Sequence, residues 1–311
     1  MSFWRDKRVL LTGGNGFLGS HVRERIAREE PAALLTPRRT EIDLRDPLAI
    51  RDFLARERPN LIVHGAAVVA GIGGNRLHPG LFFYENAIMG IQLIEAARVA
   101  GIEKFVCLGT ICSYPRDTPV PFREEALWDG YPEETNAPYG VAKKMLLVQL
   151  QGYRAEYGMR GIMVMPVNLY GPRDNFDLTT SHVIPAMIRK FSEAREQGLR
   201  EVVLWGDGTP TREFLFVEDA AEGIVTAAER YDDPEPVNLG TGVDITVADL
   251  AKKIAALTGY DGAIVWDPSR PNGQPRRRLD VSKARERFGF VARVGLDEGL
   301  RRTVEWFRSS K

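Results

Sequence analysis

Short apolar runs alternate with longer stretches in which apolar positions recur every three or four residues, through the first half of the chain. The short runs are typical of buried strands, and the longer spacing is typical of helices that cover a sheet. We expect strands at residues 8–12, 33–35, 61–64, 104–109 and 161–165. We expect helices at residues 19–29, 48–57, 88–100 and 138–157. This alternation predicts an α/β fold with a doubly wound parallel sheet of the Rossmann type.

The regular alternation ends after Gly171-Pro172-Arg173, where loops and helices rich in Pro, Gly and Arg take over. We therefore expect a dinucleotide-binding Rossmann domain over residues 1–170. Residues 171–311 are expected to form mostly a smaller substrate-binding domain, with one strand near 236–240 returning to the first sheet. The strands of the first domain are almost continuously apolar, as expected when helices cover both faces.

Composition and charge narrow the classes of function. The chain has 42 basic and 42 acidic residues, so it has no global basic field to bind a nucleic acid or an anionic membrane. No apolar stretch approaches the roughly 20 residues that span a bilayer, and the N-terminus lacks the organisation of a signal peptide. Two cysteines are too few for a disulfide framework or a zinc site. We expect a cytoplasmic protein that holds no metal.

A glycine-rich turn follows the first expected strand and opens the first expected helix. In this turn, Gly13, Gly16 and Gly19 permit a tight bend, and the backbone with Phe17 and Leu18 can then approach a pyrophosphate at the helix N-terminus. A turn of this kind can also serve tight packing alone. Its place after strand one of a βαβ pattern favours dinucleotide binding.

The residues after the second expected strand indicate which dinucleotide binds. An NAD ribose is usually held by an acidic residue about 20 positions after the glycines. Here the chain has Arg38 and Arg39, which suit the 2′-phosphate of NADP(H), although Glu41 is close enough to be a rival ribose ligand. A solvated surface turn is the alternative. Asp43 and Leu44 are expected to line the adenine pocket.

Tyr139 and Lys143 stand four residues apart and therefore lie on one face of the expected helix. A nearby ammonium favours the phenolate, so we expect the pKa of Tyr139 to be lowered and the phenol to act as a general acid or base. This spacing is common in proteins. It becomes specific together with the glycine turn and with Thr110, a hydroxyl residue just after the fourth expected strand.

These three features together resemble the extended short-chain dehydrogenase/reductase superfamily over nearly the whole chain. By that resemblance Thr110, Tyr139 and Lys143 form a catalytic triad, with Thr in the place where Ser is more usual. Further segments look like the GDP-L-fucose synthase family, whose members use NADPH to epimerise and reduce GDP-4-keto-6-deoxy-mannose. These segments are residues 64–67, 71–75, 108–115, 167–176, 181–183, 205–215 and 275–280.

The resemblance implies roles for particular residues. Cys112 and His182 would act as acid and base in epimerisation, and Ala66 would line the cofactor site. The predicted residues at the nucleotide sugar are Asn168, His182, Arg189, Trp205, Arg212 and Arg276. The resemblance also implies a homodimer in which the helix that bears Tyr139 pairs across a two-fold axis. The generic form of the glycine turn and the Thr at 110 leave room for a sister enzyme that acts on another nucleotide sugar.

Several cysteine, histidine and arginine residues also have a purely structural interpretation. We expect Cys107 to be a core thiol, His21 to serve helix packing and His64 to border the cofactor, whereas His182 alone would be a solvated loop residue. Arg212 and residues 276–278 are either surface charge or a clamp for a diphosphate.

Two other functions also remain open. One is a nucleotide-sugar 4-epimerase or dehydratase that retains NAD, and the other is a non-catalytic NADP-sensing protein.

Overall fold

The computed structural model describes residues 2–69, 77–270 and 272–310, and its central element is a six-stranded sheet. The strand order is β2-β1-β3-β4-β5-β9, and each neighbouring pair is parallel. The strands are β1 (Arg8–Thr12), β2 (Ala33–Leu35), β3 (Leu61–His64), β4 (Lys104–Leu108), β5 (Gly161–Pro166) and β9 (Val237–Leu239). The order reverses between β1 and β3, and ligands bind outside the carboxyl ends of such strands.

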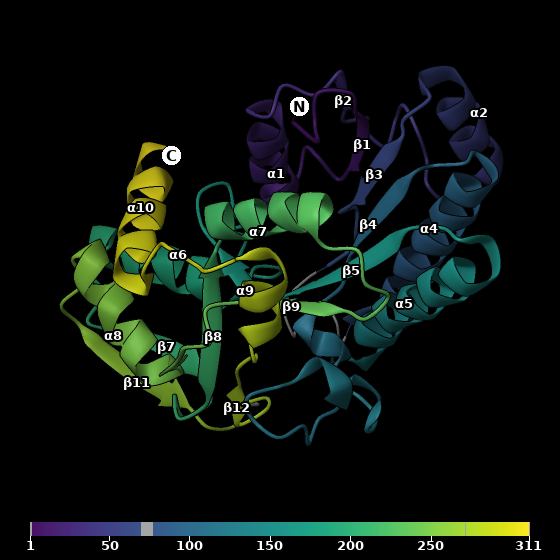
Figure 1. The fold of residues 1–311 in the computed structure, drawn as a ribbon. Coiled ribbons are helices and arrows are strands. Elements are labelled where there is room, and N and C mark those ends of the chain that lie inside the picture. The colour runs from purple at the N-terminus through teal and green to yellow at the C-terminus, as the bar shows by residue number, and fades with distance from the viewer. Residues whose placement is uncertain (1, 70–76, 271, 311) are drawn as a thin grey trace.

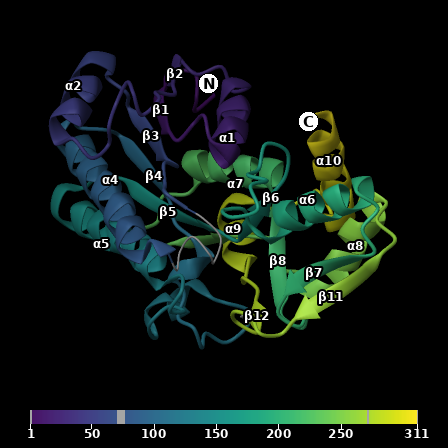
Figure 2. The same ribbon diagram turned by 180° about the vertical axis from the view of Figure 1, so that it is seen from behind.

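Helices cover both faces of this sheet (Figures 1 and 2). One face carries α2 (Pro47–Glu57), α4 (Pro79–Val99) and α5 (Ala137–Tyr157), and the other carries α1 (Phe17–Ala27) and α7 (Val217–Arg230). The long connection from β4 to α5 contains two short 3₁₀ helices, η1 (Ile111–Ser113) and η2 (Glu124–Trp128). The sheet is thus the middle layer of three.

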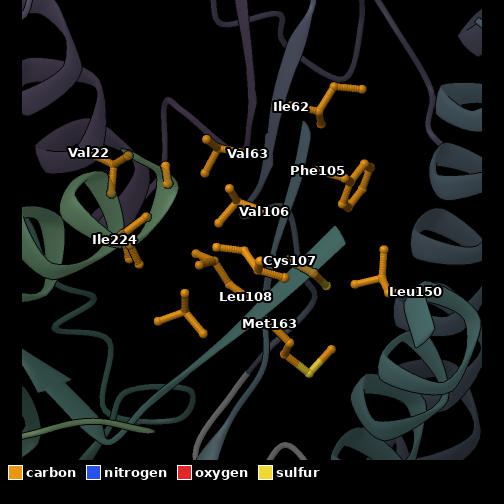
Figure 3. Packing of buried hydrophobic residues seen from close by; sticks show 14 of the residues in the cluster. Val22, Ile62, Val63, Phe105, Val106, Cys107, Leu108, Leu150, Met163 and Ile224 are labelled. Atoms are coloured by element: carbon orange, nitrogen blue, oxygen red, sulfur yellow. The ribbon is translucent and has the colours of Figure 1, made fainter. Parts of the chain in front are cut away.

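The strand side chains alternate between these two helical layers. Figure 3 shows Ile62 and Phe105 on the side of α5, and Val63 toward Val22 of α1 and Ile224 of α7. All five side chains are fully buried. Burying an aliphatic or aromatic side chain of this size stabilises a fold by about 1.5–3 kcal/mol. Because helices cover both faces of the sheet, its strands must be apolar at consecutive positions.

A second lobe carries its own hydrophobic core. A four-stranded sheet joins β10 (Asp244–Thr246), β8 (Thr211–Phe216), β12 (Arg276–Arg277) and β6 (Asn168–Tyr170), and a two-stranded sheet pairs β11 (Ala263–Asp267) with β7 (Glu201–Trp205). The helices α6 (Val183–Glu196), α8 (Val247–Thr258) and α10 (Leu296–Ser309) pack with these strands around Ile188, Phe191 and Ile254. Figure 1 shows this lobe beside the carboxyl ends of the central strands.

A buried carboxylate joins the two lobes. The Glu213 side chain, on β8, is fully buried and accepts hydrogen bonds from three backbone N–H groups. The donors are Thr241 at 2.5 Å and Gly242 at 2.8 Å, just after β9, and Leu279 at 2.6 Å, just after β12. The carboxylate therefore fastens the second lobe to the edge of the central sheet.

Asn238, within β9, makes a second connection. Its side-chain oxygen accepts a hydrogen bond from the Tyr114 hydroxyl at 2.7 Å. Its amide nitrogen donates to the backbone carbonyls of Phe122 at 3.0 Å and Asp280 at 3.1 Å. One buried amide thus holds the β4–α5 connection and the segment after β12 against the same strand.

The doubly wound fold class, the five expected strands and the returning strand near 236–240 are confirmed. The helix expected at 88–100 begins earlier, at Pro79, where proline occupies the first turn and His78 precedes it. The domain boundary near residue 170 stays a prediction. From the later part of the chain, α7, β9 and α9 (Ser282–Phe288) pack into the core of the central sheet.

Candidate active site

The turn between β1 and α1 makes backbone contacts that only glycine permits. Gly13 has a φ of +73°, and a Cβ there would lie 2.8 Å from the backbone nitrogen of Ala66. A Cβ on Gly19 would lie 1.9 Å from the Gly13 carbonyl oxygen. The Gly16 N–H donates to that same oxygen at 3.0 Å, and no side chain caps the first turn of α1. The turn is a backbone cradle at a helix N-terminus, as pyrophosphate binding requires.

The neighbouring predicted cofactor residues line the same edge of the sheet. Phe17 and Leu18 form the first turn of α1. The Ala66 N–H donates to the Thr12 hydroxyl oxygen at 3.3 Å, and that hydroxyl lies 2.8 Å from Nδ1 of His64. Burial lowers the pKa of His64 to about 3, so the ring is neutral. These contacts fix the ends of β1 and β3 against each other.

Arg38 and Arg39 follow β2 and are both exposed. The Glu41 carboxylate accepts a hydrogen bond from the backbone N–H of Arg38 at 2.8 Å, so it stabilises the turn itself. The Arg39 side chain lies 4.0 Å from Asp43, a loose ion pair. This arrangement favours the two arginines over Glu41 as the groups that meet the cofactor ribose.

Asp43 and Leu44 are fixed more tightly than the arginines. The Arg45 guanidinium binds the Asp43 carboxylate at 2.5 Å and also reaches Glu85 at 3.0 Å. The hydrogen bonds from Arg45 hold the pKa of Asp43 at about 2, so that the carboxylate is charged. The Leu44 side chain belongs to the hydrophobic core. Only the backbone of Leu44 is therefore left to contact an adenine ring.

Helix α5 packs directly on the turn that carries Cys112. A Cβ on Gly140 would lie 2.3 Å from the Cys112 carbonyl oxygen, so the two backbones are in close contact. The Ser113 hydroxyl donates to the Gly140 carbonyl at 2.9 Å. Because Gly140 follows Tyr139 directly, this packing brings the phenol beside the turn at the end of β4.

The protonation of Tyr139 and Lys143 is controlled by burial. Burial raises the pKa of the Tyr139 phenol above its ordinary value, and the thiols of Cys112 and Cys107 act in the same direction. Burial also lowers the pKa of Lys143, whose side chain is 2% exposed. The expectation that Lys143 lowers the pKa of Tyr139 is therefore wrong, because desolvation dominates. The phenol is neutral at neutral pH and can donate a proton.

The turn after β4 holds the predicted catalytic hydroxyl and thiol. The Thr110 side-chain oxygen accepts a hydrogen bond from the Cys112 N–H at 3.2 Å and so begins η1. Cys112 is half-buried in that helix. Cys107 is fully buried in β4, where burial raises its pKa to about 11 and makes it the core thiol that was expected.

His182 stands at the first residue before α6 and its side chain caps no N–H of that helix. The ring keeps contact with solvent, and the surrounding protein removes enough of its hydration to lower its pKa. A lowered pKa makes the imidazolium a stronger acid. Its placement across a sugar ring from Cys112 stays a prediction.

Two arginines of the second lobe face the same thiol. Arg277 of β12 pairs in register with Arg212 of β8. The Arg277 Nη1 donates to the Cys112 sulfur at 3.8 Å, and its Nε donates to Gln274 Oε1. Burial lowers the pKa of Arg212 to about 10, and the neighbouring Arg277 charge adds to this effect. The site is thus built from both lobes.

Arg276 points elsewhere. Its guanidinium forms two hydrogen bonds with the Asp244 carboxylate, at 2.7 and 3.0 Å. Consecutive strand residues face opposite sides of a sheet, so Arg276 and Arg277 cannot share one surface. The structure therefore places Arg277, not Arg276, next to Cys112.

Three more predicted substrate residues lie in the second lobe without a contact to Cys112. Trp205 is 52% exposed, and the Arg270 guanidinium lies 5.3 Å from the centre of its indole ring. The Asn168 amide donates to the Glu213 carbonyl at 2.9 Å. Arg189 binds a carboxylate of its own helix at 2.7 Å. Their roles in substrate binding stay predictions.

Sequence reasoning missed Arg277 as an individual residue and Glu133 altogether. Glu133, in the loop before α5, interacts electrostatically with both Arg212 and Arg277. Period-two alternation after Pro275 separates position 277 from positions 276 and 278. The alternation does not say which of these side chains faces the active site. That depends on the pairing of β12 with β8, which are far apart in the sequence.

A glycine cradle at the switch point of a doubly wound sheet, with a half-buried tyrosine and a buried lysine one helical turn apart, defines a dinucleotide-dependent enzyme class. The family model "NAD dependent epimerase/dehydratase family" matches residues 9–240, and the chain belongs to this family.

The chain is also similar to individual proteins with named activities. The chain is 39% identical to a GDP-L-fucose synthase of Escherichia coli over 97% of this chain and 96% of that protein. It is 36% identical to a GDP-L-colitose synthase of Yersinia pseudotuberculosis, over 98% and 99%. A solved GDP-L-fucose synthetase from Naegleria fowleri bound to NADP is 26% identical, with a TM-score of 0.90 over 100% of this chain and 96% of the other.

The resembling segment at residues 71–75 lies outside the described residues. Within the described ranges, no helix is long and apolar enough to cross a bilayer, and no cluster of three or more His, Cys, Asp or Glu side chains could hold a metal ion.

Replacing Arg38 and Arg39 together with Ala is expected to weaken NADPH binding about tenfold, because two exposed cations near the 2′-phosphate are lost. NADH binding should stay nearly unchanged. Fluorescence titration with both cofactors measures this, and Arg51→Ala, an exposed arginine on α2, is the control. Equal losses for the two cofactors would show that the pair does not read the phosphate.

Proposed function

We propose that the protein is an NADPH-dependent epimerase/reductase that converts GDP-4-keto-6-deoxy-mannose to GDP-L-fucose. The observation that carries this proposal is the contact between Cys112 and the helix of Tyr139, with a guanidinium on the sulfur. A ketoreductase needs one proton donor for the ketone oxygen. A second proton-transfer group beside it is what epimerisation of the neighbouring carbons adds. The GDP-L-fucose synthase relatives support this substrate.

The residues present fit NADP(H). A Cβ at Gly13 or Gly19 would fill the space in which the backbone approaches a pyrophosphate, and α1 begins there without a side-chain cap. Arg38 and Arg39 lie at the exposed edge where a 2′-phosphate would sit. Bound NADPH would supply the hydride for the C4 ketone. The NADP-bound relative from Naegleria fowleri supports this choice.

In the reduction step, Tyr139 protonates the C4 oxygen as the ketone becomes an alcohol. The raised pKa keeps the phenol protonated above pH ~10, the ordinary value for tyrosine, so the donor form is present at neutral pH. Lys143 is buried one turn further along the same helix, and its ammonium would offset part of the cost of the phenolate that forms, although burial still keeps the phenol protonated before the reaction. The Thr110 hydroxyl, fixed by the Cys112 N–H, is the further donor to the ketone oxygen.

Epimerisation uses the acidity of the carbons on either side of the ketone. Inverting C3 and C5 requires one group to remove a proton from one face of the ring and another to return one on the opposite face. Cys112 and His182 are our candidates, because thiols and imidazoles exchange protons near neutral pH. The Arg212 guanidinium, partly freed from water, is suited to a diphosphate.

The alternatives fit the site less well. A 4-epimerase or dehydratase that retains NAD has no use for two exposed arginines at the ribose or for a proton-transfer pair beside the tyrosine. A non-catalytic sensor has no use for a half-buried proton donor beside the cofactor cradle. The GDP-L-colitose synthase relative supports a GDP-linked keto sugar in the same site, as a second candidate for the substrate.

We also propose a homodimer formed through α4 and α5. These helices run side by side on the outer face of the central sheet (Figure 1). Apolar side chains project from them into solvent: Leu81, Tyr84, Val99, Val148 and Tyr157 are each at least 49% exposed. An exposed apolar patch of this kind marks an interface.

We keep the expectations of a cytosolic location and of no nucleic acid or membrane partner as proposals, supported by balanced charge and free cysteines.

The dimer proposal predicts a solution mass of twice the 34.8 kDa chain. Light scattering after size-exclusion chromatography measures that mass. Tyr84→Glu with Val148→Glu should give monomers, because buried unpaired charges oppose association. A wild-type mass equal to one chain would contradict the proposal.

Tyr139→Phe should lower the turnover number for ketone reduction by about 10²–10⁴-fold, because only the donor hydroxyl is lost. Loss of NADPH absorbance with the keto sugar measures the rate. Tyr153→Phe is the control, since that tyrosine lies on the same helix and binds Glu95 at 2.7 Å instead. Turnover retained in Tyr139→Phe would remove this phenol from the mechanism.

Cys112→Ser should still oxidise NADPH but release a sugar reduced at C4 without inversion at C3 and C5. A serine hydroxyl is too weak an acid to exchange protons near neutral pH, so epimerisation should slow by about 10²–10⁴-fold. Nuclear magnetic resonance of the product identifies the configuration. Cys107→Ala, at the buried thiol, is the control. A fully epimerised product from Cys112→Ser would make Cys112 a loop thiol only.

A further inference from the structure

The guanidinium beside Cys112 is held from both sides. Arg277 is 8% exposed, and its Nη1 donates to the Cys112 sulfur at 3.8 Å. On the other side its Nε donates to Gln274 Oε1, and the Gln274 amide donates to the Arg116 carbonyl at 2.5 Å. A buried arginine anchored in this way keeps a fixed position, so its contact with the sulfur is built into the site.

The other charges around the sulfur leave positive charge in excess. Arg212 lies opposite Arg277 in the pairing of β8 and β12, and it interacts electrostatically with Arg277, Cys112 and Glu133. Burial would raise the pKa of Glu133, but hydrogen bonds from Thr135 and Asn136 outweigh this effect and lower it, so Glu133 is a charged carboxylate. Two guanidinium groups against one carboxylate leave one positive charge, which a thiolate would balance.

The other titratable groups near Cys112 do not supply the negative charge that would balance this positive charge. Tyr139 of α5, which interacts electrostatically with Cys112, is neutral because burial raises its pKa. The Lys143 ammonium interacts with His64 and Cys107, at the ends of β3 and β4. Cys112 is therefore the group beside the uncompensated guanidinium charge, and its sulfur is the atom that Arg277 contacts.

We propose that Arg277 is a positioning residue for epimerisation, which holds the Cys112 sulfur as a thiolate aimed at the sugar. The inference rests on the function proposed above. The thiolate takes a proton from a carbon next to the ketone, and the electron pair of the broken C–H bond forms the enolate. His182, after taking a proton from water, protonates the opposite face of that carbon as the imidazolium. Proton exchange of the resulting thiol and imidazole with water restores both groups.

The chain offers a matched control for this arginine. Arg276 is the same residue type, one position earlier on the same strand, and its guanidinium binds Asp244 instead. Replacing either arginine removes one positive charge from β12. Only the replacement of Arg277 removes the contact with the sulfur.

Alkylation of the free enzyme by iodoacetamide at neutral pH tests the contact without any sugar. The thiolate is the reactive form, so Arg277→Met should slow modification of Cys112 about tenfold, as followed by peptide mass spectrometry. Arg277→Lys should keep most of the wild-type rate, and Arg276→Met should keep all of it. A wild-type alkylation rate in Arg277→Met would overturn the proposal.

Deuterium incorporation from D₂O links the contact to the reaction. Arg277→Met should incorporate deuterium at C3 about tenfold more slowly, while its thermal melting and its affinity for NADPH stay close to wild type. Slow alkylation with wild-type deuterium incorporation would overturn the assignment to epimerisation. If the wild type does not epimerise the sugar at all, the proposed function fails, yet the alkylation rates still show whether Arg277 activates the sulfur.

Discussion

The buried carboxylate of Glu213 is the constraint on which the site depends. A fully buried acid is tolerated only where hydrogen bonds replace its hydration, and three backbone N–H groups do so here. Two of the donors follow β9 of the central sheet, and the third follows β12 of the second lobe. The same carboxylate therefore sets where β12 lies relative to the central sheet. Because Arg277 is on β12, Glu213 also sets the distance from that guanidinium to Cys112.

Exclusion of water then determines the chemistry of each group. Tyr139 lies where burial keeps its phenol protonated, and the same burial makes the ammonium of Lys143 less stable. Where water is excluded, a nearby cation has a larger electrostatic effect on a titratable group than it has in water. One thiol, Cys107, is surrounded by apolar strands and stays protonated, whereas Cys112 contacts a guanidinium. The fold thus places two cysteines five residues apart in different surroundings.

The sequence was sufficient for features that depend on local patterns. Apolar runs located the strands, and the Gly13, Gly16 and Gly19 spacing located the cradle, because both follow from neighbouring residues. The spacing of Tyr139 and Lys143 also placed both on one helix, α5.

Features that depend on distant segments were not predictable in this way. Period-two alternation could separate Arg276 from Arg277, but the pairing of β12 with β8 decides which of them meets Cys112. The pKa of Tyr139 was predicted in the wrong direction, because adjacency to Lys143 can be read from the sequence and the depth of burial cannot.

The central claim is that one site both epimerises and reduces a GDP-linked 4-keto-6-deoxy sugar. Its most direct test is a single reaction of the wild-type enzyme in D₂O with ordinary NADPH and GDP-4-keto-6-deoxy-mannose, with the product analysed by nuclear magnetic resonance. We expect GDP-L-fucose with deuterium at C3 and C5 and with protium at C4, since the solvent supplies the first two hydrogens and the cofactor the third. A product reduced at C4 that carries no deuterium at C3 or C5 would contradict the claim.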